Sequence, residues 1–224
     1  MIVAKYRKRE LVSNYTILTI LALTCILPIM LLFFNSIEPQ EEFGINPFGF
    51  PITIRFANFV DAWILGEYAQ IFLNSTKLVI GTLILNLTVS GLAGFSLAKL
   101  YPRGSNAFLV YLLVGVSIPA QMFILPLFLM WKELGLMNTH FGLIIIYAGL
   151  NAPFATFLIR SYMIQLPDEL FDAAKIDGAN TLQLFYRIAL PISWPVFLTT
   201  CLVVGLAVWN EFLFALTFVH DEKK

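Results

Sequence analysis

The sequence predicts an all-α protein, a polytopic bundle of transmembrane helices that carries one polar loop on its cytoplasmic side. Apolar residues make up 59% of the chain and charged residues 12%, and the mean hydropathy is +0.82, far from the balance of soluble globular domains. The apolar residues gather in five runs, each close to the ~20 residues that cross a bilayer as a helix. Composition and run length therefore point to the same class of fold.

The N-terminal segment, residues 1–15, is basic and precedes the first apolar run, residues 16–34. A secretory signal peptide shares this order of a basic start and an apolar core. The run is longer than a usual signal core, however, and no small-x-small cleavage site follows Phe34. We interpret residues 1–15 as a cytoplasmic N-terminus and residues 16–34 as a retained transmembrane helix.

Residues 35–76 mix charged, turn-forming and aromatic residues, which predicts a loop outside the membrane. Pro39, Pro47 and Pro51 favour turns over a membrane span. The stretch 56–73 is aromatic and partly periodic, as in a helix that lies along the membrane interface. We expect an external loop that contains one interfacial helix.

Residues 77–218 form the expected core of the bundle. Four of its apolar runs are long enough to span a membrane, about residues 78–98, 107–130, 141–159 and 196–218. An N-terminus inside the cell places nine cationic residues on the cytoplasmic side and five outside, as the positive-inside rule favours. The nine are Lys5, Arg7, Lys8, Arg9, Lys99, Arg103, Arg160, Lys175 and Arg187, and the five are Arg55, Lys77, Lys132, Lys223 and Lys224.

Small and weakly polar residues recur every four positions in the second span: Asn86, Ser90, Gly94 and Ala98. This spacing places them on one face of a helix, where they would let another helix approach closely. A helix-packing role is the favoured interpretation, and contact with a transported substrate is the alternative.

Three polar residues at membrane depth are candidates for lining a translocation path: Gln121, Asn151 and Glu211. Gln121 lies between two prolines, Pro119 and Pro126, and Pro153 follows Asn151, so these helices are expected to bend. The bends could line a cavity or serve packing alone. Glu211 is the one acidic residue inside a span, and both cavity lining and structural hydrogen bonding remain open for it.

Residues 166–195 are a polar island between apolar runs, and their local chemistry predicts two short helices that meet at a corner. Pro167 suits a first helical turn, and the acidic residues after it favour the positive end of a helix. Gly178 stands where a helix commonly ends in a left-handed conformation. Asn180, with Gln183 three residues later, is typical of a capping box that starts a second helix, and we expect Pro191 to end that helix.

The same stretch resembles the EAA loop of the permease subunits of bacterial ABC importers. The form found in sugar permeases, EAA-x2-DGA-x5-F-x2-I-x-LP, is matched except that an aspartate replaces the usual glutamate. The run WNEFLFALTF also resembles the corresponding span of sugar permeases. The matching residues of this EAA-type loop (residues 166–195) are Asp172, Ala173, Ala174, Asp177, Gly178, Ala179, Phe185, Ile188, Leu190 and Pro191.

The resemblance implies a multi-pass permease subunit in the bacterial inner membrane, forming half of the path for a sugar or related polyol. It implies a second permease subunit, two ABC ATPase subunits and an external solute-binding protein as partners, with membrane lipid around the helices. The EAA-type loop would dock on an ATPase. ATP and magnesium would be bound by that ATPase, so the resemblance implies no cofactor, metal or catalytic residue in this chain.

The motifs that the sequence lacks agree with this division of labour. It contains no GxxxxGK[ST] nucleotide loop and no HExxH, CxxC or GxSxG motif, and its zero net charge gives no reason to expect a nucleic-acid partner. A permease for another solute, such as a peptide, an amino acid or phosphate, remains an alternative. An intramembrane enzyme or an ion carrier would need several ionisable groups at membrane depth, and Glu211 stands almost alone.

Permeases of this type continue beyond the fifth span with an outer loop, a sixth span and a cytoplasmic tail. We therefore expect residues 219–224 to be a truncated end, with five spans present of an expected six.

Overall fold

A computed structural model describes residues 8–219, and in this range the regular structure is helical, without strands. The predicted all-α class is confirmed. Contacts divide the chain into two compact units, Met1–Ala69 and Gln70–Lys224, which are described separately. Lys5 and Arg7 of the expected cytoplasmic N-terminus, and residues 220–224 of the expected truncated end, lie outside the described residues.

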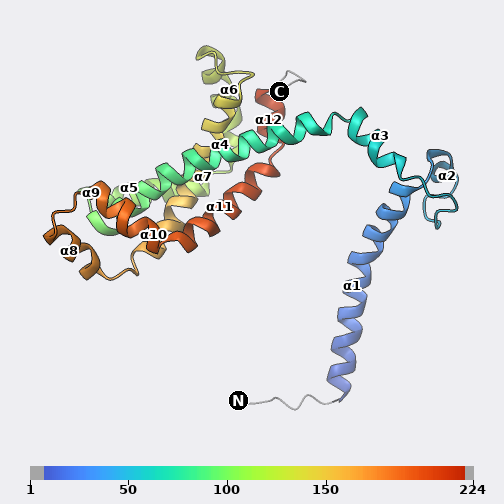
Figure 1. The fold of residues 1–224 in the computed structure, drawn as a ribbon, viewed down its shortest axis with the longest axis horizontal. Helices are drawn as coiled ribbons and strands as arrows, with labels where there is room; N and C mark the ends of the chain where they lie inside the picture. Colours follow the sequence, from blue (N-terminus) through green and yellow to red (C-terminus); the bar gives the residue numbers. More distant parts are fainter. Residues whose placement is uncertain (1–7, 220–224) are drawn as a thin grey trace. The chain divides into compact units, whose positions relative to one another are not determined.

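The first unit contains the N-terminal helix and the loop that follows it. Its helices are α1 (Lys8–Ile37), α2 (Gln40–Ile45) and α3 (Ala57–Leu65) (Figure 1). The loop is held by side chains that bind backbone groups. The Glu42 carboxylate accepts the amides of Ile52 and Thr53, and the Asn58 amide donates to the carbonyls of Ser36 and Glu38 at 3.1 and 2.8 Å.

The expected interfacial helix over residues 56–73 is not continuous. Helix α3 ends at Leu65, and helix α4 begins at Tyr68, inside the stretch assigned to the external loop. Glu67 between them has a φ of 48°, a left-handed conformation that interrupts a right-handed helix. The aromatic residues before the predicted second span therefore belong partly to α3 and partly to α4.

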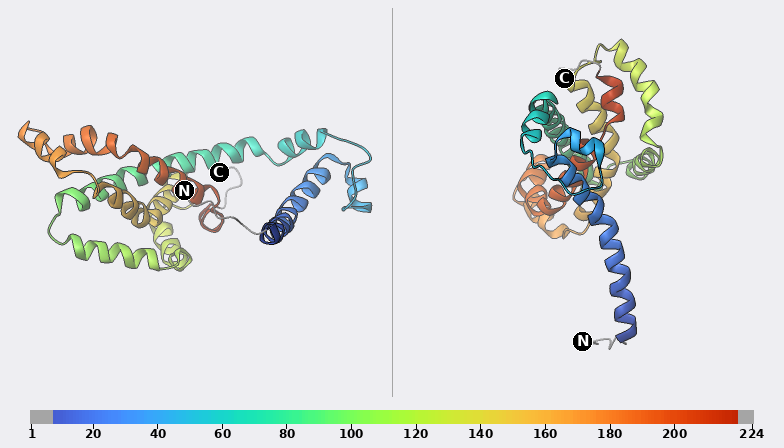
Figure 2. Two further views of the ribbon diagram at one scale, coloured as in Figure 1. Left: turned by 90° about the horizontal axis from the view of Figure 1, so that it is seen from below. Right: turned by 90° about the vertical axis from the view of Figure 1, so that its right-hand side faces the viewer.

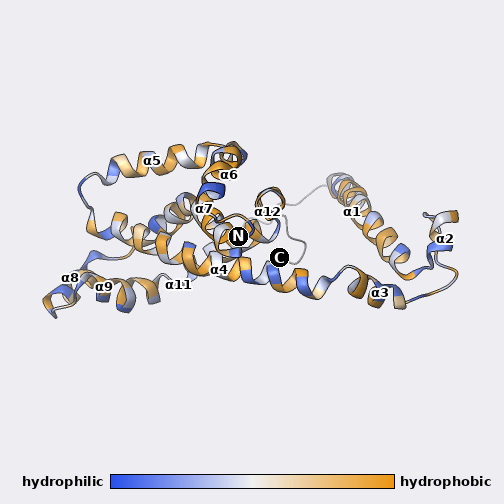
Figure 3. Cartoon of the chain, turned by 90° about the horizontal axis from the view of Figure 1, so that it is seen from above, coloured by the Kyte–Doolittle hydropathy of each residue, from blue (hydrophilic) through white to orange (hydrophobic). Residues whose placement is uncertain are grey.

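The second unit is built from α4 and the helices after it, joined by short connections. The elements are α4 (Tyr68–Phe95), the π-helical turn η1 (Ser96–Leu100), α5 (Ser105–Ser117), the 3₁₀ turn η2 (Ala120–Phe123), α6 (Ile124–Glu133), α7 (His140–Met163), α8 (Asp168–Ile176), α9 (Thr181–Leu184), the π-helical turn η3 (Phe185–Ala189), α10 (Leu190–Ile192), α11 (Trp194–Trp209) and α12 (Leu213–Phe218). Figure 3 shows apolar residues along α4, α7 and α11 and more hydrophilic residues around α8.

Three helical stretches among the described residues are long and apolar enough to cross a membrane, residues 11–37, 68–100 and 140–163. Two further pairs of helices pass the same test but are sharply bent, 105–117 with 120–133 by 96° and 181–192 with 194–209 by 78°. The structure thus offers three spans, or up to five if each bent pair is one span.

The expected third span, residues 107–130, is not straight because it breaks before Pro119. Ile118 adopts an extended conformation with ψ of 125°, as residues that precede proline tend to do. Pro153, in contrast, lies inside the continuous helix α7. The expected fifth span, residues 196–218, is also interrupted, since α11 ends at Trp209 and α12 starts only at Leu213.

Helices α4, α7 and α11 pack side by side and form the centre of the second unit (Figure 2). The small-residue stripe of α4 lies in this contact. Asn86 donates to the carbonyl of Ala148 at 2.9 Å and Ser90 to that of Ala152 at 3.3 Å, so both helices advance by four residues in register. Gly94 and Ala98 are buried in the same row.

The buried residues of this unit form two clusters near its two ends. One cluster joins α4 and α7 to the EAA-type loop and contains Phe95, Ile159, Met163, Phe171 and Phe185. The other surrounds α6 and α12 and contains Trp131, Tyr147, Val208, Phe214 and Phe218. Figure 1 shows α8 and α9 at one end of the unit and α6 and α12 at the other.

Candidate functional site

The EAA-type loop forms the predicted corner between two short helices. Helix α8 ends at Ile176, and Gly178 follows with a φ of +85°, where a side chain would be strained. The amide of Gly178 donates to the carbonyl of Lys175 at 3.0 Å, and that of Ala179 donates to Ala174 at 2.9 Å. These two bonds define a Schellman motif, which confirms the expected helix end at Gly178.

The second helix starts with the capping box that the sequence predicts. The Asn180 side chain accepts the amide of Gln183 at 2.9 Å, and the Gln183 side chain accepts the amide of Asn180 at 2.8 Å. Two backbone donors that a helix start would leave unpaired are thereby satisfied. The direction in which the chain leaves the corner is fixed by these bonds.

The helix that starts at Asn180 ends close to Pro191, as expected, but one residue after it and not before it. Helical structure continues from α9 through η3 into α10, which contains Pro191, and stops at Ser193. The wider π-helical turn over residues 185–189 ends two residues before the proline. Such a turn shifts the hydrogen-bond ladder, so a residue without an amide hydrogen is accommodated after it.

The residues of the EAA-type pattern divide into an outward and an inward group. Asp172, Ala173, Asp177 and Gly178 are exposed, whereas Phe185 is buried and Ile188 packs against the same buried cluster. Ala174, Ala179 and Leu190 are half-buried, and Pro191 is exposed. The corner therefore exposes the carboxylates of Asp172 and Asp177 beside apolar Ile176 and Leu182, while buried aromatic and aliphatic side chains anchor it to α4 and α7.

Lys99, in the π-helical turn η1 that continues α4, is a site residue that the sequence pattern assigned only to a membrane side. Its ammonium donates to the carbonyl of Leu166 and to the carboxylate of Asp168, each at 2.6 Å, and lies 5.3 Å from the centre of the Phe171 ring. The Lys99 side chain is 4% exposed. The only signal in the sequence was a cation four residues after Phe95, on the same face of a helix.

Phe171 of α8 is the apolar counterpart of the Lys99 contact. It is 3% exposed and its ring lies 6.0 Å from that of Phe95, which in turn lies 5.5 Å from Phe185. Aromatic pairs at these distances add to the stabilisation that burial gives. Three elements, α4, α8 and η3, thus meet in one aromatic cluster.

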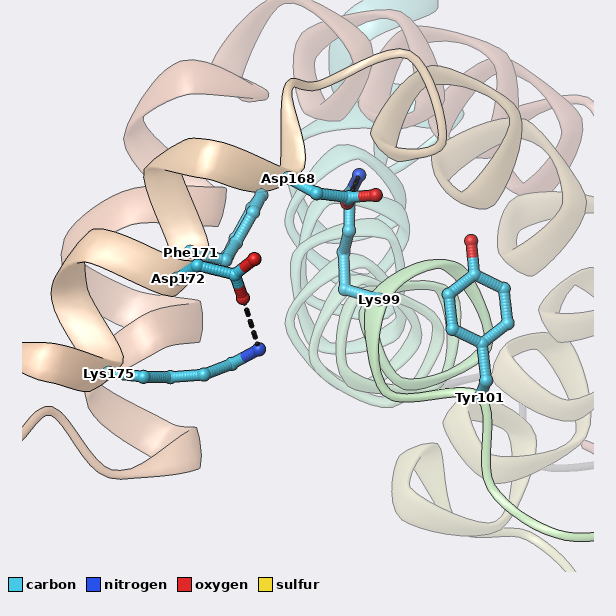
Figure 4. A pocket seen from close by; sticks show the side chains of 6 residues that line it. All are labelled: Lys99, Tyr101, Asp168, Phe171, Asp172 and Lys175. Atoms are coloured by element: carbon cyan, nitrogen blue, oxygen red, sulfur yellow. Dashed lines mark hydrogen bonds and ion pairs between the residues drawn. The ribbon is translucent and has the colours of Figure 1, made fainter.

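A cavity of about 190 Å³ lies beside α8 and is lined by Lys99, Tyr101, Asp168, Phe171, Asp172 and Lys175 (Figure 4). On its outer side Asp172 pairs with Lys175 at 2.9 Å, and these side chains are 65% and 51% exposed. An exposed pair of this kind contributes little stability, so Asp172 is available to exchange Lys175 for another cation.

The three polar residues considered for a translocation path are not brought together as one group. Glu211 accepts the Tyr147 hydroxyl at 2.6 Å, and the Asn151 amide donates to the carbonyl of Tyr147 at 2.8 Å. These two residues are therefore linked through Tyr147. Gln121 lies exposed in η2, in the connection between α5 and α6.

Several apolar helices of spanning length, joined by an exposed helical corner, are the features of a polytopic membrane protein. Residues 90–222 match the family model described as "Binding-protein-dependent transport system inner membrane component". The chain belongs to this family of inner membrane transport components, which are transport subunits rather than enzymes.

Curated relatives agree with the family. The chain is 32% identical to the probable ABC transporter permease YurM of Bacillus subtilis over 87% of its own length and 65% of the relative's. It is 34% identical to the arabinooligosaccharide transport permease AraQ of Halalkalibacterium halodurans over 90% of its length and 73% of the relative's. The chain thus spans about two thirds to three quarters of the length of these proteins.

A solved structure shows the same fold. It is that of a bacterial ABC transporter involved in the import of alginate, an acidic polysaccharide. The similarity has a TM-score of 0.87 and covers 99% of this chain and 79% of the other, at 24% sequence identity. At this identity the comparison supports the fold alone.

Proposed function

We propose that this chain is the permease subunit of an ATP-driven ABC importer for a sugar or related polyol, forming half of the translocation path. The observation that carries the proposal is the EAA-type loop, folded as a corner that exposes Asp172 and Asp177 and whose aromatic side is anchored to the membrane helices. Such a corner suits a docking element better than a connection that only joins two spans.

The outer side of α8 has the chemistry for docking into a cleft of an ATPase subunit. Asp172 offers a charge to a basic partner group, and Ala173 leaves room for close approach. The left-handed Gly178 and the capping box of Asn180 fix the angle between the two helices. A rigid corner transmits a push from the ATPase better than a flexible loop does.

The remaining partners follow from this division of labour. A second permease subunit would complete the path, a second ATPase subunit would dock on it, and an external solute-binding protein would deliver the solute. ATP and magnesium would bind at the ATPase subunits, and the absence of a GxxxxGK[ST] loop from the sequence accords with this. Transport would require the ATPase to contact two states of the permease differently.

Sugar is the solute class that the relatives favour. Besides AraQ, similar proteins are named as permeases for diacetylchitobiose in Streptomyces coelicolor and for melibiose, raffinose and stachyose in Bacillus subtilis, at 29% and 31% identity. A permease for a peptide, an amino acid or phosphate is the second candidate, because such importers share a looser form of the EAA pattern.

The orientation of the chain belongs to the same proposal. With residues 1–15 in the cytoplasm, the EAA-type loop also lies in the cytoplasm, where an ATPase can reach it. Residues 16–34 are then the first span, residues 35–76 lie largely outside, and the core follows over residues 77–218. The excess of cationic residues on the cytoplasmic side supports this orientation.

Co-purification in detergent tests docking. The wild-type chain, Asp172→Lys and Gly178→Pro are each purified with the candidate ATPase subunit. We expect the wild type to retain the ATPase and both variants to lose most of it. Asp172→Lys removes one side of a docked charge pair, which costs about 2–5 kcal/mol. Proline at position 178 can neither adopt a φ of +85° nor donate to the carbonyl of Lys175, so Gly178→Pro distorts the corner. Equal retention by all three would place docking elsewhere on the chain.

Uptake into proteoliposomes tests the solute. The complete complex is supplied with ATP and with labelled oligosaccharides, and a peptide and phosphate serve as comparison solutes. We expect ATP-dependent uptake of a sugar alone. Uptake of only the peptide or phosphate would replace the sugar assignment while leaving the docking result intact.

A further inference from the structure

We infer that Lys99 is a positioning residue: it fastens α8 to the end of α4 beside the contact of Phe171 with Phe95, so that movement of the docked EAA-type loop reaches the membrane helices through this junction. The inference rests on the proposed function, since it concerns how that loop acts. Its starting point is that the Lys99 side chain is only 4% exposed. A lysine is seldom buried so far unless its ammonium is paired.

The contacts of the Lys99 ammonium surround the first turn of α8. The carbonyl of Leu166, just before the helix, and the carboxylate of Asp168, its first residue, each accept a hydrogen bond of 2.6 Å. The Phe171 ring lies beneath the same nitrogen at 5.3 Å. The Lys99 ammonium is thus held by a main-chain carbonyl, a carboxylate and a ring, and tilting α8 away from α4 would break these contacts. Figure 4 shows Lys99, Asp168 and Phe171 close together.

The α4 side of the contact is firmly packed. Lys99 lies in the π-helical turn that continues α4, and the adjacent Ala98 is fully buried. One turn earlier, Phe95 packs on Phe171 with ring centres 6.0 Å apart. The end of α4 and the start of α8 are therefore joined by a polar and an apolar contact side by side.

One side of α8 packs against the protein and the other side is exposed for docking. Phe171 faces the protein interior, whereas Asp172, Lys175 and Ile176 are exposed, Ile176 by 87%. An ATPase can dock on the exposed side without touching Lys99. Docking and transmission of movement are then separable properties, and different substitutions should remove them.

The route from Lys99 into the bundle is also visible in the contacts. Further along α4, Gly94 lies against Ile159 of α7, and Asn86 and Ser90 bind carbonyls of the same helix. Packed side chains and hydrogen bonds with two arrangements can carry coupling between distant sites. A displacement of α8 is thereby transmitted to helices α4 and α7 at the centre of the unit.

The test uses the complete complex in proteoliposomes with four variants of this chain. Lys99→Met removes the ammonium and keeps an apolar stem over Phe171, and Lys99→Arg keeps the charge. Asp168→Asn removes one charge and leaves the carbonyl of Leu166 in place. Lys132→Met is the matched control, because it removes an exposed lysine in the last turn of α6, outside the EAA-type loop.

Three quantities are measured: ATPase retention, sugar molecules transported per ATP hydrolysed, and hydrogen exchange of the α8 amides. For Lys99→Met we expect the ATPase to be retained, uptake per ATP to fall about tenfold and exchange in α8 to rise about tenfold. Asp168→Asn should show the same changes to a smaller degree. Lys99→Arg and Lys132→Met should stay near wild type.

The outcomes separate this inference from the proposed function. Wild-type uptake per ATP in Lys99→Met overturns the inference, whether or not exchange in α8 rises, since Lys99 would then be a structural anchor only. A wild-type complex that hydrolyses ATP but moves no sugar contradicts the proposed solute instead. In that case the rate of ATP hydrolysis that the permease stimulates is measured in place of sugar uptake. Stimulation by Lys99→Met equal to that by the wild type overturns the inference. Should Lys99→Met fail to assemble, Asp168→Asn decides in the same way.

Discussion

The hydroxyl of Tyr147 donates to the carboxylate of Glu211 at 2.6 Å and ties α7 to the break between α11 and α12. The same carboxylate accepts the backbone amides of Phe214 at 3.0 Å and of Ala215 at 3.3 Å. Glu211 therefore supplies the acceptor at the start of α12, where Phe212 has no side-chain oxygen to offer. Of its two open roles, structural hydrogen bonding is the one that these contacts support.

Replacing Glu211 by alanine is expected to destabilise the chain by about 2 kcal/mol, because a charged acceptor with several donors is lost. Tyr147→Phe removes a single donor and should cost about half as much. Thermal unfolding of the purified chain in detergent measures both. Glu133→Ala is the control, since Glu133 is exposed at the end of α6; a loss as large as that of Glu211→Ala would show that the Glu211 contacts add nothing.

The close approach of α4 and α7 predicts that Gly94 tolerates no branched side chain. A Cβ at this position would lie 3.0 Å from Cγ2 of Ile159 and 3.2 Å from the amide nitrogen of Arg160. We expect Gly94→Val to destabilise the chain by about 1–3 kcal/mol through overpacking. The yield of monodisperse protein and its unfolding midpoint are the measurements.

Gly149, on the facing helix α7, provides the matched control for this substitution. A Cβ there meets nothing within 4 Å. Gly149→Ala should therefore leave stability unchanged or raise it by about 0.5–1 kcal/mol through helix propensity. If both substitutions destabilised equally, the damage would come from losing a glycine and not from the contact with Ile159.

The capping box predicts a local effect at the corner of the EAA-type loop. Asn180→Ala removes the acceptor of the Gln183 amide and should cost about 1 kcal/mol. We expect faster hydrogen exchange in residues 181–184 while α7 keeps its protection. Thr181→Ala, next to it on an exposed position, should leave exchange unchanged. Unchanged exchange in Asn180→Ala would mean that packing alone holds α9.

Local chemistry in the sequence was sufficient to predict the corner, because its determinants are short-range. A glycine at a helix end and an Asn-x-x-Gln capping box act over four residues, and the structure confirms both. The spacing of Asn86, Ser90, Gly94 and Ala98 at every fourth residue likewise predicts that they share one helix face, whichever helix packs against it. The spacing does not predict that the helix packed against this face is α7.

Features that depend on residues far apart in the chain could not be predicted from the sequence. Lys99 contacts Leu166 and Asp168, which follow it in the chain by 67 and 69 residues, so no local sequence pattern predicts these contacts. The prolines show the same limit. Pro119 accompanies a break, whereas Pro153 and Pro191 lie inside helices, because surrounding turns and packing decide whether the missing hydrogen bond is replaced.

The Asp172–Lys175 pair predicts how docking on an ATPase depends on charge and salt. The pair is exposed on both sides and worth only about 0.3–0.5 kcal/mol, so a basic group of the ATPase can replace Lys175 at small cost. Asp172→Asn should lower ATPase retention, whereas Lys175→Met should leave it within about twofold of wild type. Raising the salt concentration from about 0.05 to about 0.5 M should weaken the wild type more than Asp172→Asn, because screening acts on the exposed charge that the variant lacks. Retention that falls equally with salt in both proteins would assign the electrostatic contact to another residue of the loop, and Asp177, also exposed, would be the next to substitute.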